Sequence, residues 1–245
     1  MHLKSRILPL ITLSLFGLPN IGFSGENPMG FNGNGEAGFS DSTGNTISTS
    51  FYSALKLNYN QKHNELKSIF ELNYKSENSV QTQERYLIDL QNNRYYNAEH
   101  SYFSYIGGQL EKSRFEGIEL NSTLSLGLGK SIIKNSDTNL IGEVGIGQNS
   151  TRYTQGSGGN TNNQTIARAK LNFNHQINAQ VTFLQDLTYL TGNDQSKIES
   201  NTGFKIKVAD QMNLKASYKY RHNDNPATGV EKTDTQTALT LIYDF

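Results

Sequence analysis

The chain has 245 residues with 22 basic and 22 acidic side chains, so its formal net charge is zero and no basic surface indicates a nucleic-acid partner. It contains no cysteine, which excludes disulfides, thiolate metal sites and a cysteine nucleophile. The mean hydropathy of −0.59 is typical of a soluble protein, so any membrane role must come from the order of the residues.

The first residues, MHLKSRILPLITLSLFGLPNIGFSGE, have the layout of a secretory signal peptide. Lys4 and Arg6 precede an apolar run over residues 7–18, and small residues follow at Gly22 and Ser24. The run is too short for a transmembrane helix, which needs about 20 apolar residues. We therefore predict a signal peptide over residues 1–24, cleaved after Ser24, and a mature domain over residues 25–245.

The mature chain shows apolar and polar residues in alternation, the pattern of a β-strand with one buried face. In ISTSFYSALKLNY, for example, Phe51, Leu55, Leu57 and Tyr59 share one parity. Clear alternation is found in residues 47–59, 65–75, 167–175, 180–190, 197–208, 213–220 and 233–245. Weaker alternation, diluted by glycine, is found in residues 31–41, 83–93, 99–110, 119–130 and 138–150. The sequence thus predicts about twelve strands.

The predicted strands are about ten residues long, which exceeds the usual ~5–6 residues of soluble sheets and fits a tilted membrane-spanning strand. Tight turns near residues 60–64, 97–100, 177–179 and 209–212 alternate with longer connections such as YTQGSGGNTNNQ and HNDNPATGVEK. Bacterial outer-membrane barrels combine short turns on one side with longer loops on the other. The prediction is therefore an all-β fold, an antiparallel transmembrane β-barrel.

Alternation alone does not exclude a soluble sandwich or a lipocalin-like barrel, in which the apolar face points inward. The export signal favours the membrane barrel, and so do the aromatic residues near strand ends, as expected at membrane interfaces. The last strand carries a third feature, an apolar stripe that ends on an aromatic carboxyl terminus. The residues of this predicted assembly signal are Leu239, Leu241, Tyr243 and Phe245.

These features predict a protein of the outer membrane of a Gram-negative bacterium. Its expected partners are the lipid around the barrel wall, lipopolysaccharide at the rim with longer loops, and the outer-membrane assembly machinery. No feature of the sequence predicts a cofactor or a nucleic-acid partner.

Four stretches carry a family resemblance: GNGEAGFSDSTGNT, SRFEGIELNSTLSLGLGKSI, GEVGIG and NDNPATGVEKTDTQTALTLIYDF. Together they resemble the YdiY-like family of salt-induced outer-membrane proteins, which is catalogued mainly as a domain of unknown function. The resemblance covers nearly all of the mature chain, and it depends on the order and spacing of the stretches. One departure is Ser113, where the family often has an aspartate before the Arg-Phe pair. The resemblance implies an outer-membrane barrel without an established activity.

If the apolar parity faces lipid, the polar parity lines the lumen. The basic candidates are Lys56, Lys67, Lys75, Arg85, Arg168, Lys170, Lys197, Lys205, Lys207, Lys215, Lys219 and Arg221. The acidic candidates are Glu65, Glu71, Asp89, Glu143, Asp186, Glu199 and Asp244. This parity count gives twelve basic groups against seven acidic ones and predicts a weak preference for anions. The alternative is that the charges pair across the lumen and plug it.

The sequence shows no compact catalytic constellation. No two histidines have the spacing of zinc ligands, and the glycines of SLGLGKS and GEVGIG lie in predicted strands rather than in a phosphate loop. His222 and Asp224 begin an outward loop, where we expect solvated residues rather than a hydrolytic pair. Three functions therefore stay open: a closed structural or envelope-stress barrel, a small passive channel and, least supported, a barrel hydrolase.

Overall fold

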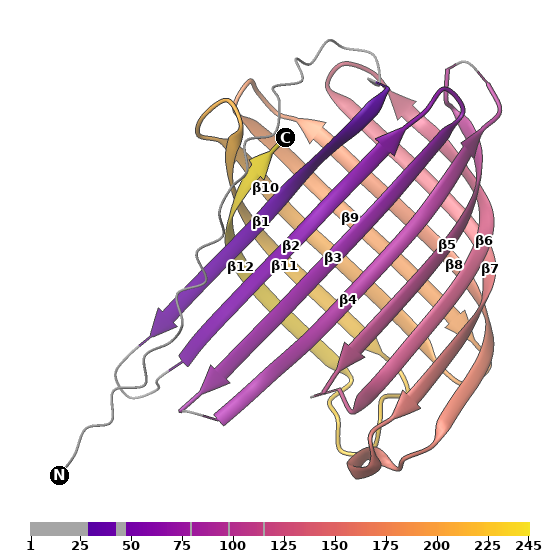
Figure 1. Ribbon diagram of the computed structural model, residues 1–245, viewed down its shortest axis with the longest axis vertical. Coiled ribbons are helices and arrows are strands. Elements are labelled where there is room, and N and C mark those ends of the chain that lie inside the picture. Colours follow the sequence, from indigo (N-terminus) through magenta and orange to yellow (C-terminus); the bar gives the residue numbers. More distant parts are fainter. Residues whose placement is uncertain (1–28, 43–47, 79, 98, 115) are drawn as a thin grey trace.

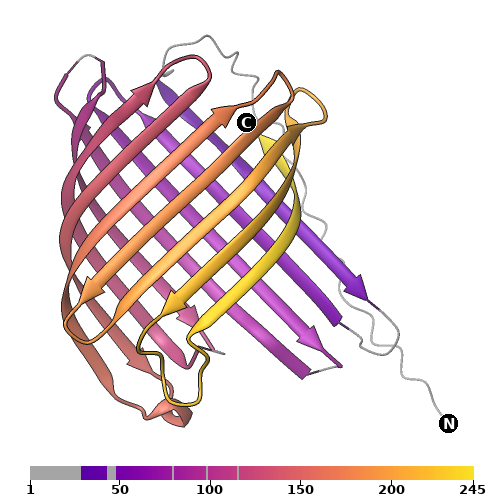
Figure 2. The same cartoon turned by 180° about the vertical axis from the view of Figure 1, so that it is seen from behind.

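In the computed structural model, the described residues (29–42, 48–78, 80–97, 99–114 and 116–245) form a closed antiparallel barrel (Figures 1 and 2). The predicted signal peptide, residues 1–24, lies outside the described residues. The described part contains twelve strands and one short 3-10 helix: β1 (Gly30–Ser42), β2 (Ser48–Asn60), β3 (Asn64–Glu77), β4 (Val80–Tyr95), β5 (Tyr102–Ser113), β6 (Ile118–Lys134), β7 (Thr138–Tyr153), η1 (Gln155–Ser157), β8 (Thr161–Gln176), β9 (Val181–Gly192), β10 (Ser196–Lys207), β11 (Met212–Asn223) and β12 (Thr233–Asp244).

Each strand pairs with its neighbours in sequence, and β1 pairs with β12 to close the ring. This confirms the predicted fold class and strand number. The strands run obliquely around the barrel (Figure 1), as ring closure requires. They have 12–17 residues and so are longer than the predicted ~10 residues. Among the described residues, no helix combines the length and the apolar character needed to span a membrane.

The two ends of the barrel differ. One end, here called the terminus end, carries the carboxyl terminus and the short turns around residues 61–63, 96–97 with 99–101, 135–137, 177–180 and 208–211. The other, the loop end, carries the two longest connections, residues 154–160 with η1 and residues 224–232, and also short ones such as residues 193–195. In Figure 1 the terminus end is at the top and the loop end at the bottom.

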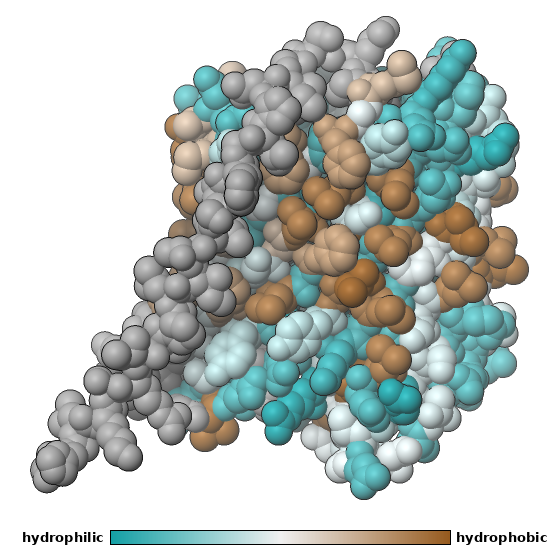
Figure 3. All heavy atoms as spheres, in the orientation of Figure 1, coloured by the Kyte–Doolittle hydropathy of each residue, from teal (hydrophilic) through white to brown (hydrophobic). Residues whose placement is uncertain are grey.

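The outer wall of the barrel is apolar. Leu124, Leu126 and Leu128 of β6 are all exposed there, and Figure 3 shows apolar side chains gathered across the middle of one face. Aromatic rings lie towards both ends of this wall. Phe51 and Tyr74 are cross-strand partners near the loop end, whereas the rings of Phe31 and Tyr59 are 5.3 Å apart near the terminus end. This is the arrangement of an outer-membrane barrel.

The interior is polar, which reverses the arrangement of a soluble domain. The buried residues include Glu36, Asn73, Arg85, Asn93 and Glu143. Two aromatic side chains also fill part of the lumen: Phe103 and Tyr105 of β5 are almost fully buried. They lie where the nearby strands β6 and β7 carry glycine, because Cβ atoms at Gly127, Gly129 or Gly145 would overlap them.

The seam between β1 and β12 is the shortest pairing of the ring. It has four paired positions, from Asn34 with Asp244 to Ala37 with Leu241, whereas β1 and β2 pair at thirteen. Phe245 extends the seam, because its N–H donates to the Gly33 carbonyl at 2.9 Å and its carbonyl accepts from the Gly33 N–H at 2.8 Å. Ring closure therefore depends on the last residue of the chain.

Deletion of Phe245 is expected to lower the amount of folded barrel, because it removes two of the few backbone hydrogen bonds of the seam. The measurement is the fraction of protein that migrates as a compact, heat-modifiable band after refolding into lipid vesicles. Phe245→Ala is the matched control, since it keeps the backbone bonds and loses only the ring. Equal folding yields for the deletion and the intact chain would contradict this account of the seam.

Candidate functional site: a charged lumen

Arg85 of β4 lies at the centre of a group of charges inside the barrel. It is 3% exposed, and its guanidinium contacts acids on two neighbouring strands. Its Nη1 is 2.9 Å from Oε1 of Glu71 on β3, and its Nε is 2.5 Å from Oε1 of Glu111 on β5. Its Nη2 is also 3.9 Å from Oε1 of Glu199 on β10. Because β4 and β10 face each other across the ring, this last contact crosses the lumen.

Lys219 of β11 completes this group. Its Nζ is 2.8 Å from Oε1 of Glu71 and 4.0 Å from Oε1 of Glu199. We call Glu71, Arg85, Glu111, Glu199 and Lys219 the Arg85 cluster. Its members come from β3, β4, β5, β10 and β11, so the cluster forms a bar of charges between opposite walls.

A second contact also crosses the interior. Arg168 of β8 has its Nη1 2.9 Å from Oε2 of Glu143 on β7, and its Nη2 donates to Oε1 of Gln91 on β4 at 3.3 Å. Gln91 in turn donates to Glu143 at 3.0 Å. The guanidinium also lies over the ring of Tyr105, 4.9 Å from its centroid, a cation–π arrangement. These contacts join β4 to β7 and β8.

The third charged group lies at the seam. Glu36 of β1 is 4% exposed and pairs with Lys56 of β2 at 2.7 Å. It also pairs with Lys215 of β11, on the other side of β12. The buried carboxylate of Glu36 therefore links β2 on one side of the seam to β11 on the other.

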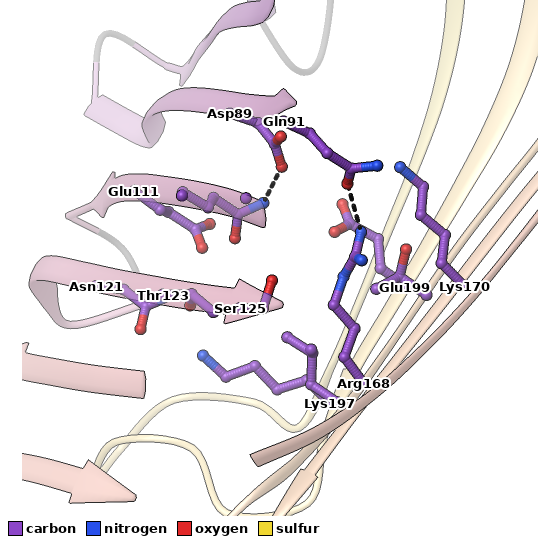
Figure 4. A pocket seen from close by; sticks show the side chains of 15 residues that line it. Asp89, Gln91, Glu111, Asn121, Thr123, Ser125, Arg168, Lys170, Lys197 and Glu199 are labelled. Atoms are coloured by element: carbon purple, nitrogen blue, oxygen red, sulfur yellow. Dashed lines mark hydrogen bonds between the residues drawn. The ribbon is translucent and has the colours of Figure 1, made fainter. Parts of the chain in front are cut away.

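Polar cavities remain between these groups, including the following two. The first, of about 110 Å³, is lined by Asp89, Gln91, Glu111, Arg168, Lys170, Lys197 and Glu199 together with amide and hydroxyl side chains of β5 and β6 (Figure 4). The second, of about 200 Å³, is lined by Asn34, Glu36, Lys56, Asn172, Asp186, Lys205, Lys215 and Asp244 among others. The interior is thus neither a packed apolar core nor an unobstructed tube.

The other predicted lumen residues occupy various positions. Lys75 pairs with Glu77 at 2.5 Å, and both side chains are about 40% exposed at the loop end. Lys207 pairs with Asp210 at 3.3 Å at the terminus end. These two lysines therefore lie at the mouths of the barrel rather than deep in the lumen.

The remaining candidates have polar partners inside. Lys205 is 3.7 Å from Asp244, and Asp186 accepts a hydrogen bond from Asn172. Asp89 accepts a hydrogen bond from Gln109 at 3.1 Å. Lys170 lines the first cavity.

Three acids that the parity count omitted lie in this lumen. Glu36 falls in the glycine-diluted first strand, Glu111 lies just beyond the alternating segment of residues 99–110, and Glu116 lies in the connection from β5 to β6. Each contacts a predicted lumen base, and for Glu116 it is Arg221, at 2.9 Å. The expected excess of about five basic groups is therefore an overestimate, and these acids reduce it by more than half.

The loops fold towards one another at the loop end. The Thr154 N–H donates to the Gly117 carbonyl at 2.8 Å, and a Cβ at Gly117 would meet both Ser157 and Ala227. Gly117 has φ +67°, a conformation that few other residues adopt. The connections after β5, β7 and β11 therefore meet at Gly117, next to the pair formed by Glu116 and Arg221.

Burial raises the pKa of Glu116 above its ordinary value of 4.5, although the nearby Arg221 acts in the opposite direction. A raised pKa means that the folded loop prefers the protonated acid. Acidification through the folded pKa therefore stabilises the docked loop, whereas the ionised form at higher pH weakens it.

His222 and Asp224 do not form a pair. Nδ1 of His222 is 2.8 Å from the hydroxyl of Thr233, and a carboxylate oxygen of Asp224 accepts from the Ser196 N–H at 2.7 Å. In the part of the chain that the structure describes, no three acidic or histidine side chains are grouped as a metal site.

A family model described as "Protein of unknown function, DUF481" matches residues 35–245, so the chain belongs to this family. No curated protein matches the sequence. Among solved structures, the chain is similar to an outer membrane channel from Pseudomonas putida F1, with 11% identity over 93% of this chain and 100% of that one and a TM-score of 0.55. It is also similar to the NanC porin, with 12% identity over 87% of this chain and 97% of that one and a TM-score of 0.50.

At these identities the likeness concerns the fold alone. The barrel matches those of Gram-negative outer-membrane proteins, and the class of fold is that of porins and channels.

Arg85→Ala is expected to lower the free energy of unfolding by about 3–5 kcal/mol, because it leaves the buried carboxylates of Glu71 and Glu111 without their shared partner. Urea unfolding in lipid vesicles measures the change. Arg152→Ala is the matched control, since Arg152 pairs with Glu119 on the surface and both are about half exposed. That change should cost about 1 kcal/mol or less. An equal decrease in the free energy of unfolding in the two variants would show that the Arg85 cluster stabilises the barrel no more than a surface ion pair does.

Glu116→Gln is expected to abolish the pH dependence of loop docking just above pH 4.5, because the amide does not titrate. The measurement is hydrogen exchange at the Thr154 amide, corrected for the intrinsic effect of pH. In the unchanged protein, protection should increase as the pH falls through the folded pKa of Glu116. Protection that decreases over this range would mean that the pair with Arg221 outweighs the cost of burial.

Proposed function

We propose that the protein is a small outer-membrane channel whose lumen is held closed by the Arg85 cluster. The observation that carries the proposal is the contact of Arg85 with acids on β3, β5 and β10, which extends from one wall to the opposite wall. A buried ion pair is a poor source of stability compared with apolar packing. A bar of paired charges across a lumen that also holds polar cavities is better explained as a gate.

The polar cavities support a channel over a solid plug. They are lined by charged and amide side chains, and charges of this kind determine which solutes pass in such barrels. The basic residues of β10 and β11 contribute less to selectivity than their number suggests, because Lys205, Lys207, Lys215 and Lys219 each have an acidic partner. We propose a weak preference for anions that arises mainly from Lys170 and Lys197.

A closed envelope-stress protein of the salt-induced type is the second candidate. It is favoured by the docked loops at the loop end and by the cross-lumen pairs, which would both persist in a barrel that never conducts. In either case we propose export through a cleaved signal peptide and insertion by the outer-membrane assembly machinery. Leu239, Leu241, Tyr243 and Phe245 would serve as the recognition signal, and lipid and lipopolysaccharide would surround the barrel.

The test is the current through the refolded protein in a planar bilayer under a potassium chloride gradient. We expect rare, brief openings for the unchanged protein. Arg85→Ala should give frequent discrete steps, because it removes the contacts that join opposite walls of the lumen. Arg152→Ala should behave as the unchanged protein. Steady, large currents through the unchanged protein would contradict a closed lumen, and silence from both proteins, shown to be folded, would favour the envelope protein.

A further inference from the structure

The first cavity lies between the two cross-lumen contacts. On β4, Arg85 belongs to one contact and Gln91 to the other, and Asp89 stands between them and faces the cavity. On the facing wall, Arg168 and Lys170 of β8 and Lys197 of β10 line the same space. Figure 4 shows these side chains directed into it from different strands.

Three of the charged groups in the cavity lack a close counter-charge. Among the residues that the structure describes, Asp89, Lys170 and Lys197 have no oppositely charged side chain within 4.0 Å. The other charged groups there are in ion pairs, Glu111 and Glu199 with Arg85 and Arg168 with Glu143. A charge in a narrow lumen loses hydration and gains little unless a partner supplies the opposite charge.

The three charges without an ion pair are separated by sign. Asp89 lies on β4, whereas Lys170 and Lys197 lie on β8 and β10, four and six strands away around the ring. Neutral hydrogen-bonding side chains lie between the two walls: Gln109, Asn121, Thr123, Ser125 and Thr188. A solute held here would meet Asp89 on one side and Lys170 and Lys197 on the other, where Glu199 also lies but is paired with Arg85.

We infer that this cavity binds a small zwitterion, a free amino acid with a short side chain. Its carboxylate would lie towards Lys170 and Lys197, and its ammonium group towards Asp89. The neutral side chains of β5 and β6 would donate and accept the remaining hydrogen bonds. The volume of about 110 Å³ restricts the solute to a small molecule. The inference rests on the proposed function, because the solute reaches the cavity through the lumen.

The test is an NMR titration of isotope-labelled protein in detergent micelles, with L-alanine as the probe. Propanoate and propylammonium are the matched probes, since each carries one of the two charges. We expect saturable shifts with L-alanine at millimolar concentration and at least about tenfold weaker binding of either matched probe, because each loses one charged contact. Asp89→Asn and Lys197→Met should each weaken L-alanine binding by a similar factor.

Lys207→Met is the control variant, since Lys207 lies at the terminus-end mouth and pairs with Asp210. It should leave the affinity unchanged. The titration is repeated in Arg85→Ala, so that a closed lumen cannot hide the cavity. No binding of L-alanine to either folded protein would overturn the inference, and so would propanoate binding as tightly as L-alanine. If L-alanine binds but the bilayer shows no current, the channel proposal is refuted and the binding site stands. If the bilayer shows current but L-alanine does not bind, only the binding site is refuted.

Discussion

The central constraint on this structure is that a twelve-stranded barrel brings charged side chains from opposite walls within reach of one another. Polar residues alternate with apolar ones along every strand, and the apolar half must face lipid. The charged half is then confined to a lumen too narrow for each group to keep its own shell of water. Arg85 shows the result most clearly, because its guanidinium satisfies carboxylates on both neighbouring strands and approaches a third across the lumen.

The same constraint connects ring closure to the interior. The seam between β1 and β12 has few backbone pairs, and Glu36 lies in it with a lysine on either side. Phe245 adds the last pair of backbone hydrogen bonds on the wall, while Glu36 adds ion pairs inside the lumen. Closure therefore depends on a small number of backbone pairs in the wall and on the ion pairs of Glu36 in the lumen. An open ring would expose both the unpaired edge of β1 and a charge that has lost one of its partners.

The sequence was sufficient to predict the twelve strands and the apolar outer face of the clearly alternating ones, because both follow from a period of two. It was not sufficient to predict which charges meet. Arg85 and Glu199 lie more than a hundred residues apart, and their contact depends on the tilt and stagger of the closed barrel, which alternation does not encode. Glycine hid the alternation around Glu36, and Glu116 lies in a loop where parity has no meaning. The predicted excess of lumen bases was too large for these reasons.

The most direct test of the closed lumen uses the absence of cysteine from the chain. Thr123→Cys places a single thiol in the first cavity, where Thr123 is 8% exposed. The measurement is its rate of reaction with a charged, water-soluble thiol reagent in proteoliposomes, with Arg85 intact or replaced by alanine. If the Arg85 cluster closes the lumen, the thiol should react slowly with Arg85 present and at least about tenfold faster without it, the factor of a 1.4 kcal/mol difference. Fast labelling in the presence of Arg85 would show that the lumen is open and that the bar of charges is not a gate.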